Sequence, residues 1–428
     1  MFDLFLNLYH FLWAFLSALF SGFPSRKMKV IGVTGTSGKS TVVDLASNIL
    51  EEAGYKVAVL SSIKIKVGDK EEENLFKMTM PGRGYLQSFL KKAQREGCQY
   101  VIIEVTSEGI LQHRHRFIDF DTAVFTTLYP EHIERHGNFK NYRAAKGKLF
   151  QSVKKLHILN LDDKNLNYFL SFPAQRKIGF TINGWQPVNS AQENIEVVRA
   201  DNYQEHKDRI IFRVKNTEFS LNLIGKFNIH NALAAICIGI SQGVSLEICQ
   251  KALAKISGIP GRMEVVIKNP CKVIVDYAHT PDALEKVYKT LKLQLTNQKS
   301  KIICVLGSCG GGRDKWKRPI LGKIAHQFCD EIIITNEDPY DEPPTEIIKQ
   351  VFKGIPQERQ KTAKQILDRR EAIKEAIKLA RPQDIVIITG KGCEPWMCVE
   401  NGKKIPWDDR TIAKEEFEKL KDKLFIAD

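Results

Sequence analysis

Residues 29–41, KVIGVTGTSGKST, have the residue types and the spacing of a phosphate-binding turn. Residues 29–33 are rich in Val and Ile and predict a buried strand. Glycines that allow unusual backbone angles follow, and then a helix whose apolar residues fall on one stripe. Backbone N–H groups and the positive end of a helix dipole surround such a turn, so the stretch is suited to binding a phosphate.

The residues of this turn have separate expected roles. We expect Lys39 to reach the β- and γ-phosphates of a nucleotide and Ser40 to ligate Mg²⁺. The spacing departs from G-x-x-x-x-G-K-[ST], because Gly32 comes one place too early, and an ordinary glycine turn is the alternative. The other residues expected to surround the phosphates are Gly35, Thr36, Ser37, Gly38 and Thr41.

Two more predicted strands end in residues that could hold a metal. Residues 100–105 predict a buried strand that ends at Glu104, and residues 122–128 predict one that leads to His132. Ligands of a parallel α/β sheet gather beyond the carboxyl ends of its strands, so we expect these ends to converge with the phosphate loop. The alternatives are that Glu104 is a surface acid and that His132 is a loop histidine with its hydrogen bonds satisfied within the protein. Lys146, on a helix after His132, is predicted by the residues alone to be a solvated helix lysine.

Helices and strands alternate along the rest of the first half. Residues 57–61 predict a strand, residues 64–74 a charged hairpin or loop, and residues 82–95 a helix. From about residue 155 the pattern changes to short strands, and residues 257–261 form the best linker candidate. The short strands and the helices that follow them are predicted at 157–161, 209–214, 219–224, 232–240 and 246–256.

A second α/β series follows the linker. We expect a central P-loop ATPase-type domain with a parallel sheet at 28–258 and a Rossmann-like α/β domain at 259–428, after an apolar helix at 1–27. The strands of the second series are predicted near 273–277, 302–306, 331–335 and 384–389, and its helices near 282–293, 323–328 and 370–379.

Polar residues also end the strands of this second series. Residues 306–315 predict a strand followed by a glycine-rich, basic loop that can approach an anion closely. A domain with such strand ends should bind a small polar substrate facing the nucleotide site. The residues at the domain junction and the strand ends include Arg262, Asp276, Arg313, Asp338, Tyr340, Gly390 and Glu394.

Composition limits the classes of protein that fit. The chain has 64 Lys and Arg against 50 Asp and Glu, a net charge of +14. Such a charge suits nucleic acid, a membrane surface or a polyanionic substrate, but the basic residues are spread and no RNA-binding aromatic motif is visible. We therefore expect no nucleic-acid partner. The 9 cysteines include no C-x-x-C pair, which indicates buried thiols in a reducing cytosol.

Residues 2–23 are almost wholly apolar, and Pro24, Ser25, Arg26 and Lys27 follow them. The length could just span a bilayer, with the basic residues on the cytoplasmic side. A helix in the membrane plane, with Trp13 at the interface, and a helix docked on the protein or a partner are the alternatives. We expect association with the inner face of the membrane; the sequence leaves the mode open.

In their order along the chain, these motifs resemble those of the Mur ligase family, most closely its members that add the third residue of the peptidoglycan stem peptide. The likeness runs from about Lys29 to the C-terminus. Its motifs are TGTSGKST at 34–41, EVTS at 104–107, EHIERHG at 131–137, AAK at 144–146, FNIHNA at 227–232, GRME at 261–264, DYAHTP at 276–281, GKG at 390–392 and DDR at 408–410.

The resemblance implies an ATP-dependent amide ligase that acts on a peptidoglycan precursor and an amino acid, and we expect the chain to be a monomer. A substrate carboxylate attacks the γ-phosphate to give an acyl phosphate, and an amino group then displaces phosphate. In the family, residues matching Glu104 and His132 hold magnesium and the one matching Lys146 is carbamylated, which reverses the interpretation of that lysine. The resemblance also implies contacts of Asn231 with adenine, of Arg262 and Asp276 with the nucleotide, and of Thr106 and Ser107 with substrate. It further implies that the domains close around the linker at 257–261 during catalysis.

Several features depart from the family pattern. A UDP-sugar-binding domain normally precedes the phosphate loop, which here starts near residue 34, so we expect the sugar to be held differently or the carboxylate substrate to differ, as a lipid-linked one would. Residues 337–340, EDPY, lack the Arg that grips the distal carboxylate of meso-diaminopimelate, which predicts lysine or another cationic or neutral amino acid. Cys393 and Glu108 each stand at a position where the family has a histidine.

Two alternatives to this function remain open. The first is another Mur-like amide ligase, such as folylpolyglutamate synthase. The second is a membrane-tethered, nucleotide-binding regulator without catalysis. Retention of Lys39, Glu104, His132 and Lys146 favours the ligase.

Overall fold

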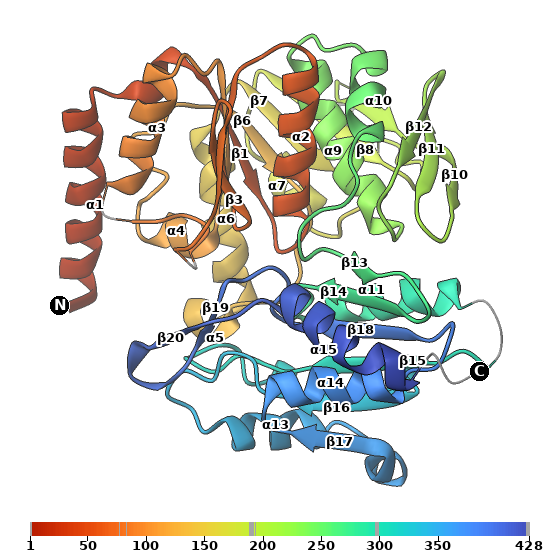
Figure 1. Ribbon diagram of the computed structural model, residues 1–428. Helices are drawn as coiled ribbons and strands as arrows, with labels where there is room; N and C mark the ends of the chain where they lie inside the picture. Colours follow the sequence, from red (N-terminus) through yellow and green to blue (C-terminus); the bar gives the residue numbers. More distant parts are fainter. Residues whose placement is uncertain are drawn as a thin grey trace. The chain divides into compact units, whose positions relative to one another are not determined.

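The computed structural model describes residues 2–76, 78–82, 84–187, 192, 194–295 and 299–424 (Figure 1). The ends of the predicted segments 1–27 and 259–428 therefore lie partly outside the described residues. The chain divides into two compact units, and the predicted domain bounds stay a prediction. The first unit comprises Met1–Pro130, His136–Asn222 and Lys226–Ser257, and the second Glu131–Arg135, Leu223–Gly225 and Gly258–Asp428.

A nine-stranded sheet forms the centre of the first unit, in the order β4-β3-β2-β5-β1-β6-β7-β8-β9. The strands β2, β5, β1, β6, β7, β8 and β9 run parallel to one another. Strands β3 and β4 form an antiparallel hairpin at the edge next to β2, which confirms the hairpin predicted at 64–74. The strands are β1 (Lys29–Thr34), β2 (Val57–Leu60), β3 (Lys64–Val67), β4 (Lys70–Glu73), β5 (Tyr100–Glu104), β6 (Phe120–Phe125), β7 (Leu156–Asn160), β8 (Arg176–Thr181) and β9 (Glu196–Arg199).

The short strands predicted after residue 155 divide between two sheets. The first of them, β7, belongs to the large parallel sheet, whereas β10 (Asp201–Glu205), β11 (Ile210–Val214) and β12 (Thr217–Leu221) form a separate antiparallel sheet. The buried side chains of β11 and β12 alternate along each strand, as expected for a sheet with one covered face.

Helices cover the large sheet because their apolar stripes need a hydrophobic surface. Helix α2 packs against α9, whose residues are apolar on nearly every side and are buried. The helices of this part of the chain are α1 (Phe2–Ser21), η1 (Pro24–Lys27), α2 (Lys39–Glu52), α3 (Tyr85–Arg95), α4 (Ser107–Leu111), α5 (Ile133–His136), α6 (Phe139–Ser152), α7 (Leu166–Leu170), α9 (Phe227–Ser241) and α10 (Leu246–Ala254).

The N-terminal helix α1 lies beside α3 on the surface of the first unit (Figure 1). Aromatic contacts join Phe11 and Phe15 to Phe117, with 5.3 Å between ring centroids in both cases. Of the modes that the sequence leaves open, the structure therefore shows a helix docked on its own protein. Among the described residues, no helix combines the length and the hydropathy needed to cross a membrane.

A six-stranded sheet forms the centre of the second unit, in the order β13-β14-β18-β15-β16-β17. All its strands are parallel except the edge strand β13. The strands are β13 (Glu264–Ile267), β14 (Lys272–Asp276), β15 (Ile302–Leu306), β16 (Glu331–Thr335), β17 (Ala363–Ile366) and β18 (Ile385–Thr389), and a hairpin of β19 (Trp396–Cys398) and β20 (Lys404–Pro406) follows.

The helices of the second unit are α11 (Pro281–Gln294), α12 (Lys317–Phe328), α13 (Pro344–Phe352), η2 (Gln357–Thr362), α14 (Arg369–Leu379), η3 (Glu400–Gly402) and α15 (Asp409–Leu424). The helix predicted at 323–328 thus begins earlier, at Lys317. The predicted fold class, a parallel-sheet α/β domain followed by a second α/β domain, is confirmed.

Candidate active site

The phosphate loop connects β1 to α2 through two glycines that no other residue could replace without a clash. Gly35 and Gly38 have φ angles of +154° and +83°. A Cβ atom on Gly35 would lie 1.9 Å from Oγ1 of Thr126, and one on Gly38 would lie 2.4 Å from Oδ1 of Asn231. The loop is therefore packed closely against the end of β6 and against α9, the helix that carries Asn231.

Hydrogen bonds from the segment after β6 hold the loop in its shape. The amide of Thr36 donates to the carbonyl oxygen of Thr127 at 2.7 Å. The hydroxyl of Thr36 accepts from the amide of Tyr129 at 3.2 Å and lies 3.1 Å from the hydroxyl of Tyr142. The side chains of Ser37 and Tyr129 are also hydrogen-bonded. The fold itself thus sets the conformation of the phosphate loop.

The cationic and hydroxyl residues of the loop stand at the start of α2, as predicted. Nζ of Lys39, the first residue of α2, donates to the carbonyl oxygens of Gly35 at 3.2 Å and Thr36 at 3.0 Å. Ser40 and Thr41 are buried in the first turn. Their roles toward a nucleotide stay predictions.

Lys146 is buried, and its amine points at the phosphate loop. Nζ donates to the carbonyl oxygen of Gly35 at 2.7 Å and lies 4.8 Å from the centroid of the Tyr142 ring. Burial, and then the charge of Lys39, hold the pKa of Lys146 well below its ordinary value. The prediction of a solvated helix lysine is wrong, because α6 turns this residue toward the loop and away from water. A neutral amine at this position is a nucleophile.

Glu104 lies beside the phosphate loop because β5 pairs with β1. The pairing places Glu104 next to Val33, one residue before the end of β1. The Glu104 carboxylate is fully buried and accepts hydrogen bonds from the amide of Ser62 at 2.9 Å and from its hydroxyl at 3.0 Å. The alternative of a surface acid is wrong. Sequence reasoning missed Ser62, although its position directly after a predicted strand was a usable signal.

Thr106 and Ser107 open the short helix α4 next to Glu104. The hydroxyl of Thr106 caps this helix by accepting from the amide of Gly109 at 3.1 Å. The hydroxyl of Ser107 lies 3.1 Å from Nε2 of His136, and both residues are buried. The sequence placed His136 in a motif but gave it no role. After Ser62, it is the second polar residue of this site that the sequence did not assign.

The oxygen-bearing residues near the loop suit magnesium. Magnesium prefers oxygen ligands and is commonly held by one or two carboxylates together with substrate phosphates, and Ser40 and Glu104 supply such atoms. In the described part of the chain, no group of three or more His, Cys, Asp or Glu side chains gathers to bind a metal. His132 belongs to the second unit, where its Nδ1 lies 3.4 Å from a guanidinium nitrogen of Arg313, and its metal role stays a prediction.

In the second unit, Asp276 fixes a turn that presents Arg262. The Asp276 carboxylate accepts from the amides of Met263 and Ala278, both at 2.7 Å, and burial raises its pKa. The guanidinium of Arg262 lies 4.3 Å from the centroid of the Tyr277 ring. Asp276 thus acts on the backbone around Arg262. Direct contact of either residue with a nucleotide stays a prediction.

Glu337, which follows the carboxyl end of β16, has a carboxylate wedged between two glycines. A Cβ atom would lie 2.3 Å from its Oε2 if placed on Gly390 and 3.4 Å if placed on Gly307. Its Oε1 accepts from Sγ of Cys309 at 2.9 Å, whereas its buried Oε2 has no hydrogen-bond partner among the described residues. Burial raises the pKa of Glu337. This residue was not assigned a role from the sequence.

The predicted substrate residues around Glu337 are hydrogen-bonded to Lys391 and Cys398. Asp338 accepts from Nζ of Lys391 at 3.0 Å and from the amide of Cys398 at 2.7 Å. Lys391 also donates to Glu394 at 3.0 Å. The amide of Tyr340, which has a φ of +52°, donates to the carbonyl oxygen of Cys398 at 3.1 Å. Direct contacts of Asp338, Tyr340 and Glu394 with a substrate stay predictions.

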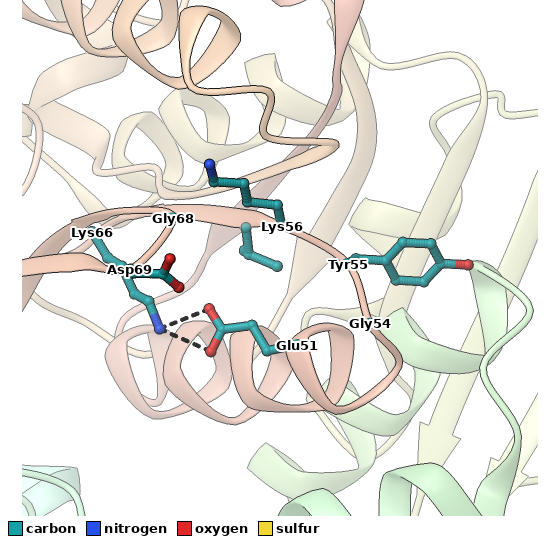
Figure 2. A pocket seen from close by; sticks show the side chains of 8 residues that line it. Glu51, Gly54, Tyr55, Lys56, Lys66, Gly68 and Asp69 are labelled. Atoms are coloured by element: carbon teal, nitrogen blue, oxygen red, sulfur yellow. Dashed lines mark hydrogen bonds and ion pairs between the residues drawn. The ribbon is translucent and has the colours of Figure 1, made fainter.

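Figure 2 shows a cavity of about 330 Å³ that lies away from these residues. It is lined by Glu51 and Gly54 near the last turn of α2, whereas the phosphate loop precedes the first turn of that helix. An ion pair at 2.8 Å between Lys66 and Glu51 borders it. The cavity contains none of the predicted site residues, and we assign it no ligand.

Solved structures place both units in a fold that is used by ligases. The fold resembles that of a solved UDP-N-acetylmuramoyl-L-alanyl-D-glutamate–2,6-diaminopimelate ligase, with a TM-score of 0.58 and 29% identity over 92% of this chain and 79% of that one. It also resembles folylpolyglutamate synthase from Mycobacterium tuberculosis, with a TM-score of 0.66 but 14% identity over 88% of this chain and 92% of that one, a likeness of fold alone.

The sequence comparisons then define the family. The Mur ligase middle domain matches residues 33–239, and the Mur ligase, glutamate ligase domain matches residues 261–392. The chain belongs to the Mur ligase family and is an ATP-dependent acid–amino-acid ligase, which confirms the predicted class of enzyme.

Two relatives match most of the chain. One, from Syntrophomonas wolfei subsp. wolfei, is named UDP-N-acetylmuramoyl-L-alanyl-D-glutamate–2,6-diaminopimelate ligase; it is 38% identical over 416 residues, which is 94% of this chain and 81% of the relative. The other, from Roseiflexus sp., is named UDP-N-acetylmuramyl-tripeptide synthetase; it is 34% identical over 429 residues and covers 95% of this chain and 81% of the relative.

Proposed function

We propose that this ligase adds an amino acid to the carboxylate of a UDP-N-acetylmuramoyl-dipeptide by way of an acyl phosphate. The names of relatives that match almost the whole chain support this substrate class. The observation that carries the proposal is the Lys146 amine, 2.7 Å from the carbonyl oxygen of Gly35 in the phosphate loop. A buried amine beside that loop suits an enzyme in which a modified lysine assists a metal.

The phosphate loop would bind and orient ATP. Backbone N–H groups of residues 35–41, the dipole of α2 and the Lys39 ammonium together neutralise the triphosphate. The substrate carboxylate then attacks the γ-phosphorus, ADP leaves, and the incoming amine displaces phosphate from the acyl phosphate. Asn231, packed against Gly38, is in a suitable place to contact the adenine, as the resemblance implies.

Magnesium and a carbamate on Lys146 belong to the same proposal. The neutral Lys146 amine would attack carbon dioxide, forming an N–C bond and releasing one proton, so that a buried neutral group becomes an anionic carbamate. The low pKa of Lys146 supports this step, because only the neutral amine is nucleophilic. The carbamate, Ser40, Glu104 and His132 would hold the metal, which lowers the charge on the transferring phosphoryl group when bound.

The added amino acid is proposed to carry a side-chain cation or to be neutral. The carboxylate of Glu337 has one oxygen without a partner among the described residues, and such an oxygen favours an ammonium group. Tyr340 occupies the position at which diaminopimelate-adding enzymes have an Arg that grips the distal carboxylate. The relative from Syntrophomonas wolfei is named for diaminopimelate, so lysine and diaminopimelate are the two amino acids to compare directly.

We further propose that the enzyme is cytoplasmic and monomeric and that residues 2–23 contact the inner face of the membrane. The apolar composition of these residues supports the membrane contact. The magnesium, the carbamate, the monomeric state and the membrane contact are independent of the amino-acid preference and have separate tests.

The test of the function is phosphate release from ATP with a panel of acceptors and amino acids. The acceptors are UDP-N-acetylmuramoyl-L-alanyl-D-glutamate, a lipid-linked equivalent and a folate, and the amino acids are lysine, ornithine, meso-diaminopimelate and glutamate. We expect release only with the first acceptor and an amino acid, with lysine preferred. Release with folate and glutamate would indicate the alternative ligase. The Lys39→Ala variant is the control for contaminating ATPases.

A further inference from the structure

Helix α1 turns mainly small and polar residues, together with Phe11, toward the first unit and leaves most of its large apolar residues exposed. The less exposed residues, which recur at helical spacing and include Ala and Ser, are His10, Phe11, Ala14, Ser17, Ala18 and Ser21. The outward residues are Phe5, Leu8, Leu12, Leu19 and Phe20, with exposed fractions of 67%, 55%, 46%, 48% and 78%. A surface helix of a water-surrounded protein has the opposite arrangement.

The docked side of the helix makes specific contacts with the first unit. Oδ1 of Asn7 lies 2.7 Å from Nε2 of His113, and the Phe11 ring packs edge-on against the same imidazole, 5.7 Å between centroids. At the other end, Nζ of Lys91 donates to the carbonyl oxygen of Phe20 at 3.3 Å. Since both ends are attached, α1 lies along the surface of the unit and does not project from it.

The outward side forms one apolar face, which we name the outer face of α1. It comprises Phe5, Leu8, Tyr9, Leu12, Trp13, Leu16, Leu19 and Phe20, all exposed. Apolar surface of this kind is unfavourable in water and marks a binding surface. Tyr9 and Trp13 have amphipathic rings of the type that collect at the boundary between lipid headgroups and acyl chains.

Charge indicates which apolar partner fits. Residues 5–23 contain no Asp or Glu, and the exposed Arg26 and Lys27 follow after Pro24 and Ser25. The guanidinium of Arg26 lies 4.7 Å from the centroid of the Phe23 ring, so a positive charge borders the end of the helix. Anionic lipids attract such basic residues. A second copy of the chain would instead bring another net charge of +14, which repels its like.

We propose that the outer face of α1 lies in the plane of an anionic lipid bilayer, at the level of the headgroups, while the opposite side of the helix stays docked on the first unit. This inference rests on the proposed membrane contact of residues 2–23 and makes it specific: it names the face, the orientation and the lipid charge. It does not depend on which amino acid the ligase adds.

The test is flotation of the full chain with vesicles of phosphatidylcholine, with or without phosphatidylglycerol. We expect binding to the anionic vesicles, weakened by salt, and release by alkaline carbonate. The double variant Leu12→Glu/Leu16→Glu should bind about tenfold more weakly or worse, because two charges enter the face that meets the acyl chains. The matched control is Leu293→Glu, at a leucine that is 74% exposed in the second unit, and it should bind as the parent does.

A second measurement guards against loss of folding in the double variant. In the parent chain, lipids brominated near the headgroup should quench fluorescence, and Trp13→Phe should remove most of that quenching. Equal flotation of the parent and the double variant would overturn the proposal. So would absence of flotation together with a dimer that the double variant dissociates, which would assign the outer face to a second copy. Phosphate release in vesicle-free solution should be unchanged in Leu12→Glu/Leu16→Glu and in Leu293→Glu. A failure of the ligase proposal and a failure of the lipid contact are therefore distinguishable.

Discussion

The amine of Lys146 lies 2.7 Å from the carbonyl oxygen of Gly35, although the two residues are 111 positions apart in the sequence and five strands, β2 to β6, lie between them. The contact joins α6 to the phosphate loop. It places a buried amine with a lowered pKa beside the residues that would hold ATP. Any change of charge on this amine is therefore felt at the phosphate site.

Replacing Lys146 should separate its catalytic effect from its cost to stability. We expect Lys146→Ala to lose turnover by about 100-fold or more, because the proposed metal ligand is gone, and short carboxylic acids to restore part of it. The readout is phosphate release. Lys148→Ala, at an exposed lysine of the same helix, is the control. Normal activity in Lys146→Ala would remove the carbamate from the mechanism.

The same lysine gives a pH dependence with a definite sign. The folded-state pKa of Lys146 is lowered by burial, so the unfolded chain binds more protons and stability rises with pH between the lowered value and the ordinary one. Lys146→Met should therefore be more stable than the parent near neutral pH in the absence of carbon dioxide. That advantage should shrink as the pH rises. Calorimetric Tm values across the range provide the check.

Gly38 and Gly54, near opposite ends of α2, allow a matched test of the phosphate loop. Their φ angles are nearly equal, +83° and +85°, but a Cβ on Gly38 would meet Asn231 at 2.4 Å, whereas a Cβ on Gly54 would have no atom within 4 Å. Gly54→Ala should lose about 1 kcal/mol of stability through backbone strain, and Gly38→Ala should lose more, because its Cβ would also clash with Asn231. Only Gly38→Ala should lose ATP affinity, measured by calorimetric titration. Equal ATP affinities in the two variants would contradict this account of the loop.

Glu337 should determine the affinity for the incoming amino acid. Glu337→Gln keeps the shape and removes the charge, so kcat/KM for a cationic amino acid should fall by roughly 10- to 100-fold, the effect of a hydrogen bond to a charged group. The KM for ATP should stay unchanged. Glu331→Gln, at the opposite end of β16 in an exposed pair with Lys301, is the control. A fall in ATP affinity instead would show that Glu337 serves the nucleotide site.

The buried pair of Arg369 and Asp409 should carry much of the stability of the second unit. The two side chains are fully buried and lie 2.7 Å apart, with a second bond at 2.9 Å. Arg369→Met leaves an unpaired buried carboxylate and should cost about 3–5 kcal/mol. Lys374→Met, which removes an exposed pair with Glu371 on the same helix, should cost about 0–1 kcal/mol. Thermal unfolding of both variants gives the comparison.

His157 should make the first unit sensitive to acid. Burial lowers its pKa to about 4, whereas the unfolded chain has the ordinary value of 6.5, so the unfolded state binds the extra proton. Stability should fall as the pH drops from 6.5 toward 4, by roughly 3 kcal/mol in total. His157→Leu should flatten this decline in urea midpoints measured across the range, and His206→Leu, at an exposed histidine, should not. A parallel decline in both variants would assign the acid sensitivity to other groups.

Local sequence determined the class of fold and the phosphate loop. The strands predicted at 302–306 and 331–335 agree with β15 and β16, because continuous apolar runs are what strands covered on both faces need. The phosphate loop followed from glycines and a lysine within a few positions, since its geometry is set by neighbouring residues. Glu104 was placed at a strand end for the same reason.

Tertiary packing alone decided which side chains lose water and which faces stay exposed. Lys146 looked like a solvated lysine because its own helix carries many polar residues; only the approach of the phosphate loop buries it. The uniform hydrophobicity of residues 2–23 gave no stripe from which to choose a docked side, so the contacts of Phe11 and Phe15 with Phe117 were needed to define the outer face. Burial depends on neighbours that are distant in sequence, and the pattern of a single segment does not contain them.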